Sequence, residues 1–164
     1  MYNPSTIANY FIKKYSSEGA LTPMKLIKLV YISYAWYLTL TEGEKTLIDE
    51  KPQAWDYGPV FPSLYQSLKK FGKTEIQKTI PNQSLWEKIR DEDKPFLNKM
   101  WDMYGSYGGI YLSAITHTDN SPWDKAFKKG YNHNISDKDI LEHYVPKLKP
   151  KTETNTKYNY TESN

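Results

Sequence analysis

Residues 22–41 read TPMKLIKLVYISYAWYLTLT, and this stretch decides the fold class. It begins with a side-chain acceptor, Thr22, followed by a proline, which is a common start of an α-helix. Apolar and aromatic residues then recur at three- and four-residue steps, as on one face of a helix. This face comprises Leu26, Leu29, Val30, Ser33, Tyr37 and Leu40. We therefore expect a helix over residues 23–41 with one buried stripe, and Lys25 and Lys28 lie off that stripe.

The same start signal recurs at Asn3-Pro4 and Ser121-Pro122, with Gly58-Pro59 as a weaker version, and Ser136 is a further candidate N-cap. We expect helices over residues 4–15, 23–41, 60–71, 91–104, 110–115, 122–129 and 136–144. Short extended segments at 47–48 and 53–55, and an alternating segment at 74–80 that could pair with 47–48, allow a small sheet of two or three strands. The predicted fold is therefore all-α, a mostly helical single domain of about seven helices.

The length of 164 residues fits one domain, which we place at residues 1–148. Residues 149–164 form a polar tail with few apolar side chains, too few to repay the entropy of ordering by themselves. The start of the chain lacks the pattern of a signal peptide, and no apolar run approaches the ~18 residues that span a bilayer. We expect a cytoplasmic protein without a membrane partner.

Candidate catalytic and metal-binding residues are scarce. The chain has no cysteine, and its three histidines, His117, His133 and His143, are scattered, so we expect no metal and no cofactor. A hydroxyl, an imidazole and a carboxylate occur together at 116–121, but neighbours in sequence rarely face one another as triad members do. Asp119 and Ser121 are better interpreted as turn and cap residues. We expect no catalytic residue and no enzyme.

The formal net charge is only +3, and basic and acidic residues are mixed. There are two small basic clusters, at 69–73 and 125–129, and the first, interleaved with Tyr65 and Phe71, could contact a nucleic-acid backbone. Three lysines at a helix end are more often a solvated surface. We therefore do not expect nucleic acid as the partner.

Aromatic residues are the unusual feature of the composition, with 15 tyrosines and 5 tryptophans. In the run QAWDYGPVFP at 53–62, Trp55 could fill the core while Gly58 and Pro59 form a corner; alternatively, Tyr57 or the nearby Tyr65 binds a partner. Both alternatives stay open.

A second aromatic constellation is the SPW run formed by Ser121, Pro122 and Trp123. His117, just before it, is expected at a helix end bonding free carbonyls, with partner contact as the alternative. We expect one partner-binding face from Tyr57, Tyr65 and His117, extended by Tyr158 and Tyr160 of the tail. The structural positions around it are Trp55, Gly58, Pro59, Ser121, Pro122 and Trp123.

Three blocks together resemble the Panacea domain, also called SocA-like and related to phage-associated GepA-type proteins. They are LTPMKLIKLVY (21–31) with Trp36; QAWDYGPVFPSLY (53–65) with KFG (70–72); and TH (116–117) followed by SPW (121–123). The resemblance covers roughly residues 2–148. It implies a helical antitoxin that neutralises a toxin encoded nearby by direct contact, and it brings no catalytic residues.

Three alternatives to the antitoxin stay open. The resemblance also allows an adaptor that delivers a bound client to a protease. A phage or prophage protein that binds a host defence or regulatory factor is the next, and an uncharacterised hydrolase comes last. The sequence identifies neither the partner nor its target.

Overall fold

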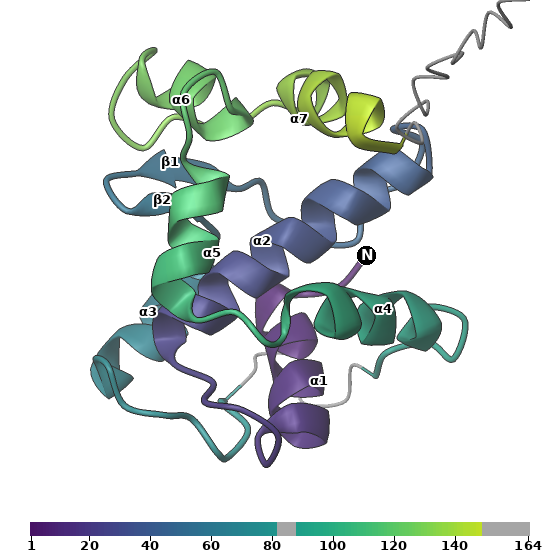
Figure 1. Ribbon diagram of the computed structural model, residues 1–164, viewed down its shortest axis with the longest axis vertical. Helices are drawn as coiled ribbons and strands as arrows, with labels where there is room; N and C mark the ends of the chain where they lie inside the picture. The colour runs from purple at the N-terminus through teal and green to yellow at the C-terminus, as the bar shows by residue number, and fades with distance from the viewer. Residues whose placement is uncertain (82–87, 149–164) are drawn as a thin grey trace, which may run out of the picture.

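Seven α-helices, two 3-10 helices and one two-stranded hairpin make up the part of the chain that the computed structural model describes, residues 1–81 and 88–148 (Figure 1). The mostly helical single domain predicted from the sequence is confirmed. The elements are α1 (Pro4–Tyr15), α2 (Pro23–Leu40), β1 (Gln53–Trp55), β2 (Gly58–Val60), α3 (Pro62–Leu68), η1 (Lys69–Phe71), α4 (Lys94–Tyr104), α5 (Gly109–Thr116), α6 (Pro122–Phe127), α7 (Asp137–Tyr144) and η2 (Val145–Leu148).

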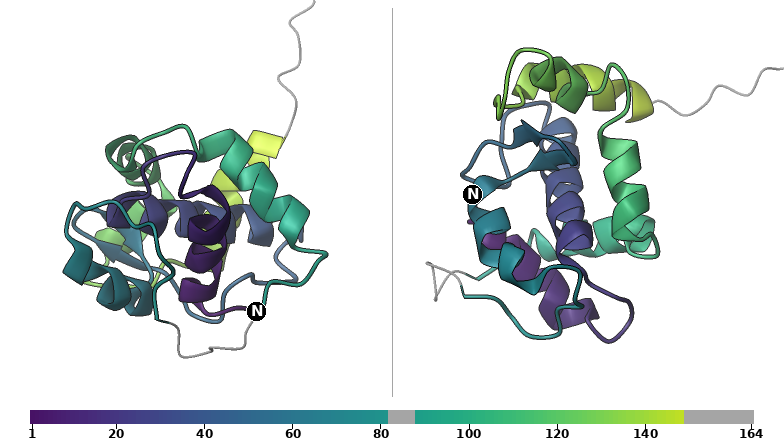
Figure 2. Two further views of the ribbon diagram at one scale, coloured as in Figure 1. Left: turned by 90° about the horizontal axis from the view of Figure 1, so that it is seen from below. Right: turned by 90° about the vertical axis from the view of Figure 1, so that its left-hand side faces the viewer.

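Helix α2 runs through the middle of the molecule and is covered by other elements on all sides (Figures 1 and 2). It contacts α1, α3, α4, α5, α7 and strand β2. The expectation of a single buried stripe was therefore wrong, because nearly every residue of α2 is buried, including Lys25 and Lys28. Leu40, which we assigned to the stripe, lies at the C-terminal end of α2 and is 54% exposed.

The two buried lysines of α2 donate hydrogen bonds to backbone carbonyls of neighbouring elements. Lys25 Nζ lies 2.5 Å from the Gly105 oxygen and 5.0 Å from the centre of the Trp101 ring. Lys28, which is only 2% exposed, donates from Nζ to the Pro59 oxygen at 3.0 Å. Burial lowers the pKa of Lys25, and it lowers the pKa of Lys28 to about 7.

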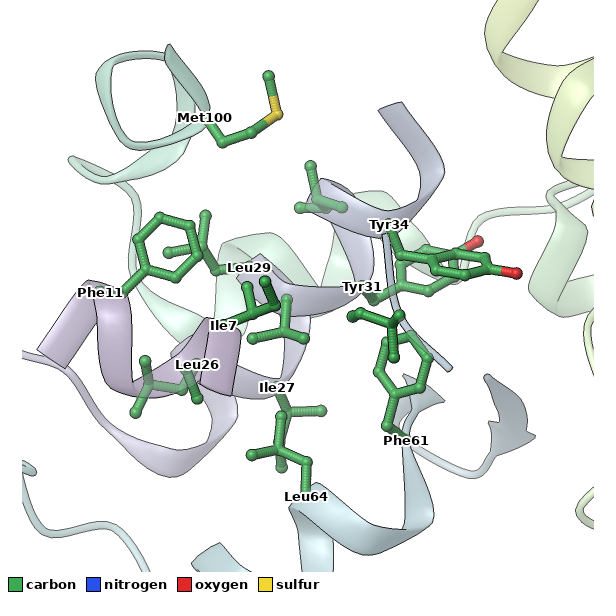
Figure 3. Close-up of a cluster of buried hydrophobic side chains, with 14 of the residues drawn as sticks. Ile7, Phe11, Leu26, Ile27, Leu29, Tyr31, Tyr34, Phe61, Leu64 and Met100 are labelled. Atoms are coloured by element: carbon green, nitrogen blue, oxygen red, sulfur yellow. The ribbon is translucent and has the colours of Figure 1, made fainter. Parts of the chain in front are cut away.

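Apolar side chains from the surrounding helices fill the space around α2 (Figure 3). Phe11 of α1 and Met100 of α4 pack on one side of the central helix, and Leu64 of α3 packs on another. Helix α5 approaches α2 closely at Gly109, where a Cβ atom would lie 2.8 Å from the backbone nitrogen of Lys25. A larger residue at this position would therefore push the two helices apart.

The predicted helix starts are confirmed at four positions. The side chains of Asn3, Thr22, Ser121 and Ser136 each accept a hydrogen bond from a backbone N–H in the first turn of their helix. The Gly58-Pro59 signal was wrong, because both residues belong to β2 and α3 begins only at Pro62. Among the described helices, none combines the length and the hydropathy that are needed to cross a membrane.

The small sheet has two strands, as one of the predicted alternatives allowed, but only one of its strands was expected. β1 and β2 form an antiparallel hairpin, and Asp56 and Tyr57 are the two residues of its loop. Segment 74–80 is not a strand. Its Ile76 nitrogen donates to the Leu21 oxygen at 2.8 Å, and the predicted partner segment 47–48 instead bridges Tyr2.

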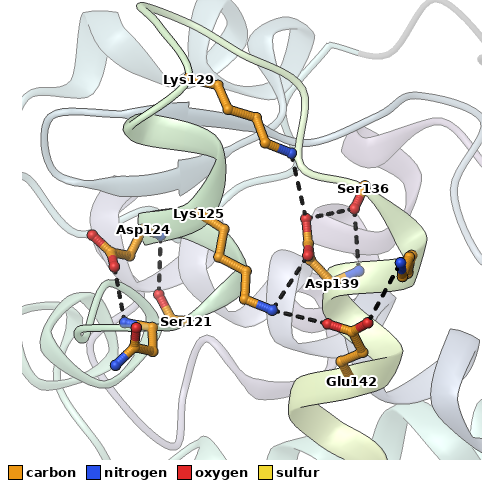
Figure 4. A network of polar contacts seen from close by, with 9 residues as sticks. Ser121, Asp124, Lys125, Lys129, Ser136, Asp139 and Glu142 are labelled. Atoms are coloured by element: carbon orange, nitrogen blue, oxygen red, sulfur yellow. Dashed lines mark hydrogen bonds and ion pairs between the residues drawn. The ribbon is translucent and has the colours of Figure 1, made fainter.

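Helices α6 and α7 are joined by charged side chains (Figure 4). Lys125 Nζ of α6 lies 2.9 Å from a Glu142 carboxylate oxygen and 3.4 Å from one of Asp139, both in α7. Lys129 Nζ lies 4.0 Å from Asp139. The basic cluster at 125–129 is thus largely compensated by acidic residues within the fold.

Replacement of Lys28 by methionine should change how stability depends on pH. Because Lys28 has a pKa of about 7 in the folded protein and an ordinary, higher one when unfolded, the unfolded state binds more protons between pH 7 and about 10. The wild-type free energy of unfolding should therefore gain about 2 kcal/mol from this residue between about pH 7 and pH 9. Lys28→Met should lack this gain in urea unfolding experiments.

The control is Lys99→Met, because Lys99 is an exposed lysine of α4. This variant should keep the wild-type pH dependence. A Lys28→Met variant with the same slope as the wild type would contradict the assignment.

Candidate functional site

A pocket of about 450 Å³ opens between the N-terminal half of α2, the β-hairpin and the segment α3–η1. Its α2 wall carries Pro23, Met24 and Ile27, together with part of Lys28. Val60 of β2 adds a further apolar side chain. The floor is therefore mostly apolar, as in most binding pockets of this size.

Aromatic residues surround the mouth of this pocket. Tyr57, at the tip of the hairpin, is 75% exposed, and Tyr131 is 80% exposed. Trp55 and Tyr65 meet edge to face with ring centres 4.9 Å apart, and both line the pocket. The structure thus brings together Trp55, Tyr57 and Tyr65, three residues that the sequence analysis had singled out.

The alternative in which Trp55 fills the core does not hold, and Trp123 is not a core residue either. Both side chains are half-buried and pack against the outside of the core. Trp55 forms one wall of the pocket instead of filling the interior. Trp123 stacks on Phe127 with ring centres 4.7 Å apart.

Side chains from three helices hold the backbone of the hairpin. Trp123 Nε1 of α6 donates to the Trp55 oxygen at 2.7 Å, and Ser113 Oγ of α5 donates to the Tyr57 oxygen at 2.8 Å. Lys28 of α2 supplies the third bond, to Pro59. The loop that carries Tyr57 is therefore held through its own backbone and through the strand on each side of it.

Position 58 needs a glycine because of its backbone conformation and because other side chains pack closely against it. Its φ is +100°, and a Cβ atom there would lie 2.9 Å from Lys28 Nζ and 3.4 Å from His117 Nδ1. His117 therefore lies directly behind the hairpin, although it is not among the residues that line the pocket.

His117 lies at the C-terminal end of α5, where the sequence placed it. Its Nδ1 contacts the Ser113 carbonyl oxygen, and its ring meets the Trp123 ring at 5.2 Å. Ser121 Oγ accepts a hydrogen bond from the Asp124 nitrogen at 3.2 Å as the cap of α6. The imidazole of His117 and the hydroxyl of Ser121 thus bond to different partners, each within a few residues of its own position.

Within residues 1–81 and 88–148, no group of three or more His, Asp or Glu side chains could hold a metal ion. Tyr158 and Tyr160, which we expected to extend the binding face, lie outside the described residues.

Sequence reasoning missed Tyr131 at this pocket and, elsewhere, two exposed side chains on helix α5. Tyr131 joins the pocket because the chain returns beside β1, where the Ala54 nitrogen donates to the His133 oxygen at 2.9 Å. The isolated tyrosine after Gly130 gave no signal of this. On α5, Ile110 is 82% exposed and Tyr111 is also exposed, although this helix is apolar on all faces.

Comparison with models of known protein families shows which family the chain belongs to. The model for the antitoxin SocA-like Panacea domain matches residues 26–124, which is more than half of the chain. The chain belongs to the SocA-like Panacea domain family. Searches of curated proteins and of solved structures give no match to it.

The Panacea match covers less of the chain than the resemblance suggested from sequence. It contains α2 from Leu26 onward, the hairpin, α3, α4, α5 and the first turn of α6. Pro23, Met24 and Tyr131 line the pocket but lie outside the matched span. The pocket therefore combines residues of the Panacea match with residues from the chain on either side of it.

Substitutions of Trp123 should separate its hydrogen bond from its packing. Trp123→Phe removes the donor to the Trp55 carbonyl and should lower the free energy of unfolding by about 1 kcal/mol. Trp123→Ala also removes the ring. Because the side chain is only half-buried, its total cost should be about 2–3 kcal/mol, less than for a fully buried tryptophan.

Urea unfolding of both variants measures these differences. A phenylalanine variant as stable as the wild type would show that the bond to the hairpin adds no net stability.

Proposed function

We propose that this protein is an antitoxin that neutralises a toxin encoded nearby, in the cytoplasm, by binding it directly and without catalysis. Membership of the SocA-like Panacea family supports an antitoxin-like role. The observation that carries the proposal is the pocket with Trp55, Tyr57, Tyr65 and Tyr131 around its mouth. Such a surface is suited to binding another protein.

Protein interfaces depend on a few anchors that are often tyrosine or tryptophan, placed beside a pocket and shielded from water. Tyrosine supplies a large contact area at a small cost in side-chain entropy. Here the tip of the hairpin is held at three backbone carbonyls, so little further ordering is needed when a partner binds. These features favour binding by a preformed surface.

We assign different roles to the residues of this face. Tyr57 and Tyr65 are the proposed partner contacts, because both are exposed at the pocket. His117, which packs behind the hairpin, is proposed to contact the partner as well. Tyr158 and Tyr160 of the tail are proposed to extend it. The structural positions are those that hold the hairpin and the start of α6: Trp55, Gly58, Pro59, Ser121, Pro122 and Trp123.

Alanine substitutions of Tyr57, Tyr65 and His117 should weaken toxin binding more than they weaken the fold. At a true hot spot each change costs roughly 2 kcal/mol or more of binding energy. The test is co-expression with the product of the adjacent toxic gene, reading growth rescue together with the melting temperature of each variant.

Leu40→Ala is the matched control, because Leu40 is an exposed apolar residue at the far end of α2. This variant should rescue growth like the wild type. If all three variants of the proposed face stay folded and rescue fully, the toxin is bound elsewhere.

The same experiment tests how the toxin is neutralised. Under the proposal, toxin levels stay constant while growth recovers, since direct binding leaves the toxin intact. Rescue that requires a cellular protease, with loss of the toxin, would instead identify an adaptor. If no neighbouring gene product is toxic and a host factor is captured, the protein acts as a phage-type binder of that factor.

A further inference from the structure

We propose that the pocket beside the hairpin takes an acidic segment of a protein partner, with one large aromatic side chain inserted and carboxylates placed around it. This inference rests on the proposed function, because it names the chemistry of the partner that binds at the same site. It draws on three properties of the pocket: its size, its apolar floor and the uncompensated positive charge on one side.

The size and floor of the pocket favour an aromatic anchor. A volume of about 450 Å³ exceeds that of one aromatic side chain and leaves room for adjoining backbone. Ile27, Met24 and Val60 present apolar surface inside, and Trp55 and Tyr65 stand at the side. A ring inserted here would meet other rings edge to face or offset, which are the favoured geometries of aromatic pairs.

The charge of one rim favours acidic residues next to this anchor. Lys69 lines the pocket, and Lys70 and Lys73 follow it on the same exposed segment. None of the three forms an ion pair with any acidic residue in the part of the chain that the structure describes. By contrast, Lys125, Lys128 and Lys129 are all paired with acids of the fold.

The lining contains a single acidic residue, Asp56, at the tip of the hairpin. Lys69 offsets this charge within the lining, and Lys70 and Lys73 next to it leave this rim with a net positive charge that attracts a negative group. Unpaired lysines next to an apolar pocket complement a ligand that carries an apolar anchor and flanking carboxylates.

The same observations favour a protein segment over a nucleic acid. Lys69, Lys70 and Lys73 occupy one short segment beside the pocket, and the formal net charge of the chain is only +3, whereas a nucleic-acid backbone is usually bound by an extended basic surface.

Three synthetic peptides of equal length test the proposal. Each has a central tryptophan, flanked by glutamates in the first, by glutamines in the second and by lysines in the third. Fluorescence anisotropy should show the glutamate peptide binding about fivefold more tightly than the glutamine peptide, as expected for a few exposed charge pairs. The lysine peptide should bind most weakly, and the difference should shrink as NaCl rises from about 50 to about 500 mM.

Two variants locate the binding. Lys69→Glu should remove the preference for the glutamate peptide, whereas Lys99→Glu on α4 makes the same change of net charge away from the pocket and should keep it. Tyr131→Ala should weaken binding of the glutamate and glutamine peptides alike. Because Tyr131 is so exposed, this variant should unfold at the wild-type temperature.

Several results would overturn the inference. These are equal affinity for the glutamate and glutamine peptides, no binding of any peptide, or tighter binding of an oligothymidine strand than of the glutamate peptide. If Lys69→Glu still rescues growth fully in the toxin assay, the pocket inference fails while the antitoxin proposal stands. If the peptides bind as expected but no neighbouring gene product is neutralised, the antitoxin proposal fails instead.

Discussion

The burial of nearly all of helix α2 is the constraint on which the rest of the structure depends. A helix without a solvent-exposed face needs partners on every side, and six elements of the fold supply them. Its two lysines can be buried only because the backbone carbonyls of Gly105 and Pro59 accept hydrogen bonds from their amino groups. These two bonds attach the α4–α5 link and the hairpin to the central helix, and the bond from Lys28 lies at the wall of the pocket.

The sequence predicted the elements whose signals are local. Asn3, Thr22 and Ser121 marked helix starts correctly, because cap and first-turn residues act within a few positions of one another. Segment 74–80 was misread because its two isoleucines are held by distant partners, Leu21 and Asn9, which periodicity does not reveal. The burial of the lysines was missed for the same reason.

Prediction of the candidate site was partial on similar grounds. Tyr57 and Tyr65 stood out because they flank a glycine–proline pair in one short run. Tyr131 and Lys28 did not, since they reach the pocket from residues far away in sequence. A pocket assembled from α2, the hairpin and a returning loop is a tertiary property, and only the order of the helices in space brings its walls together.

The division between a buried axis and an exposed rim has a consequence for how such a protein could change its target. Lys69, Tyr57 and Tyr131 belong to short exposed segments and contribute little to the interior. Exchanging them alters shape and charge at the mouth of the pocket at a small cost in stability, since surface changes are usually nearly neutral. The fold can thus acquire a new binding specificity through a few substitutions, and each intermediate variant remains folded.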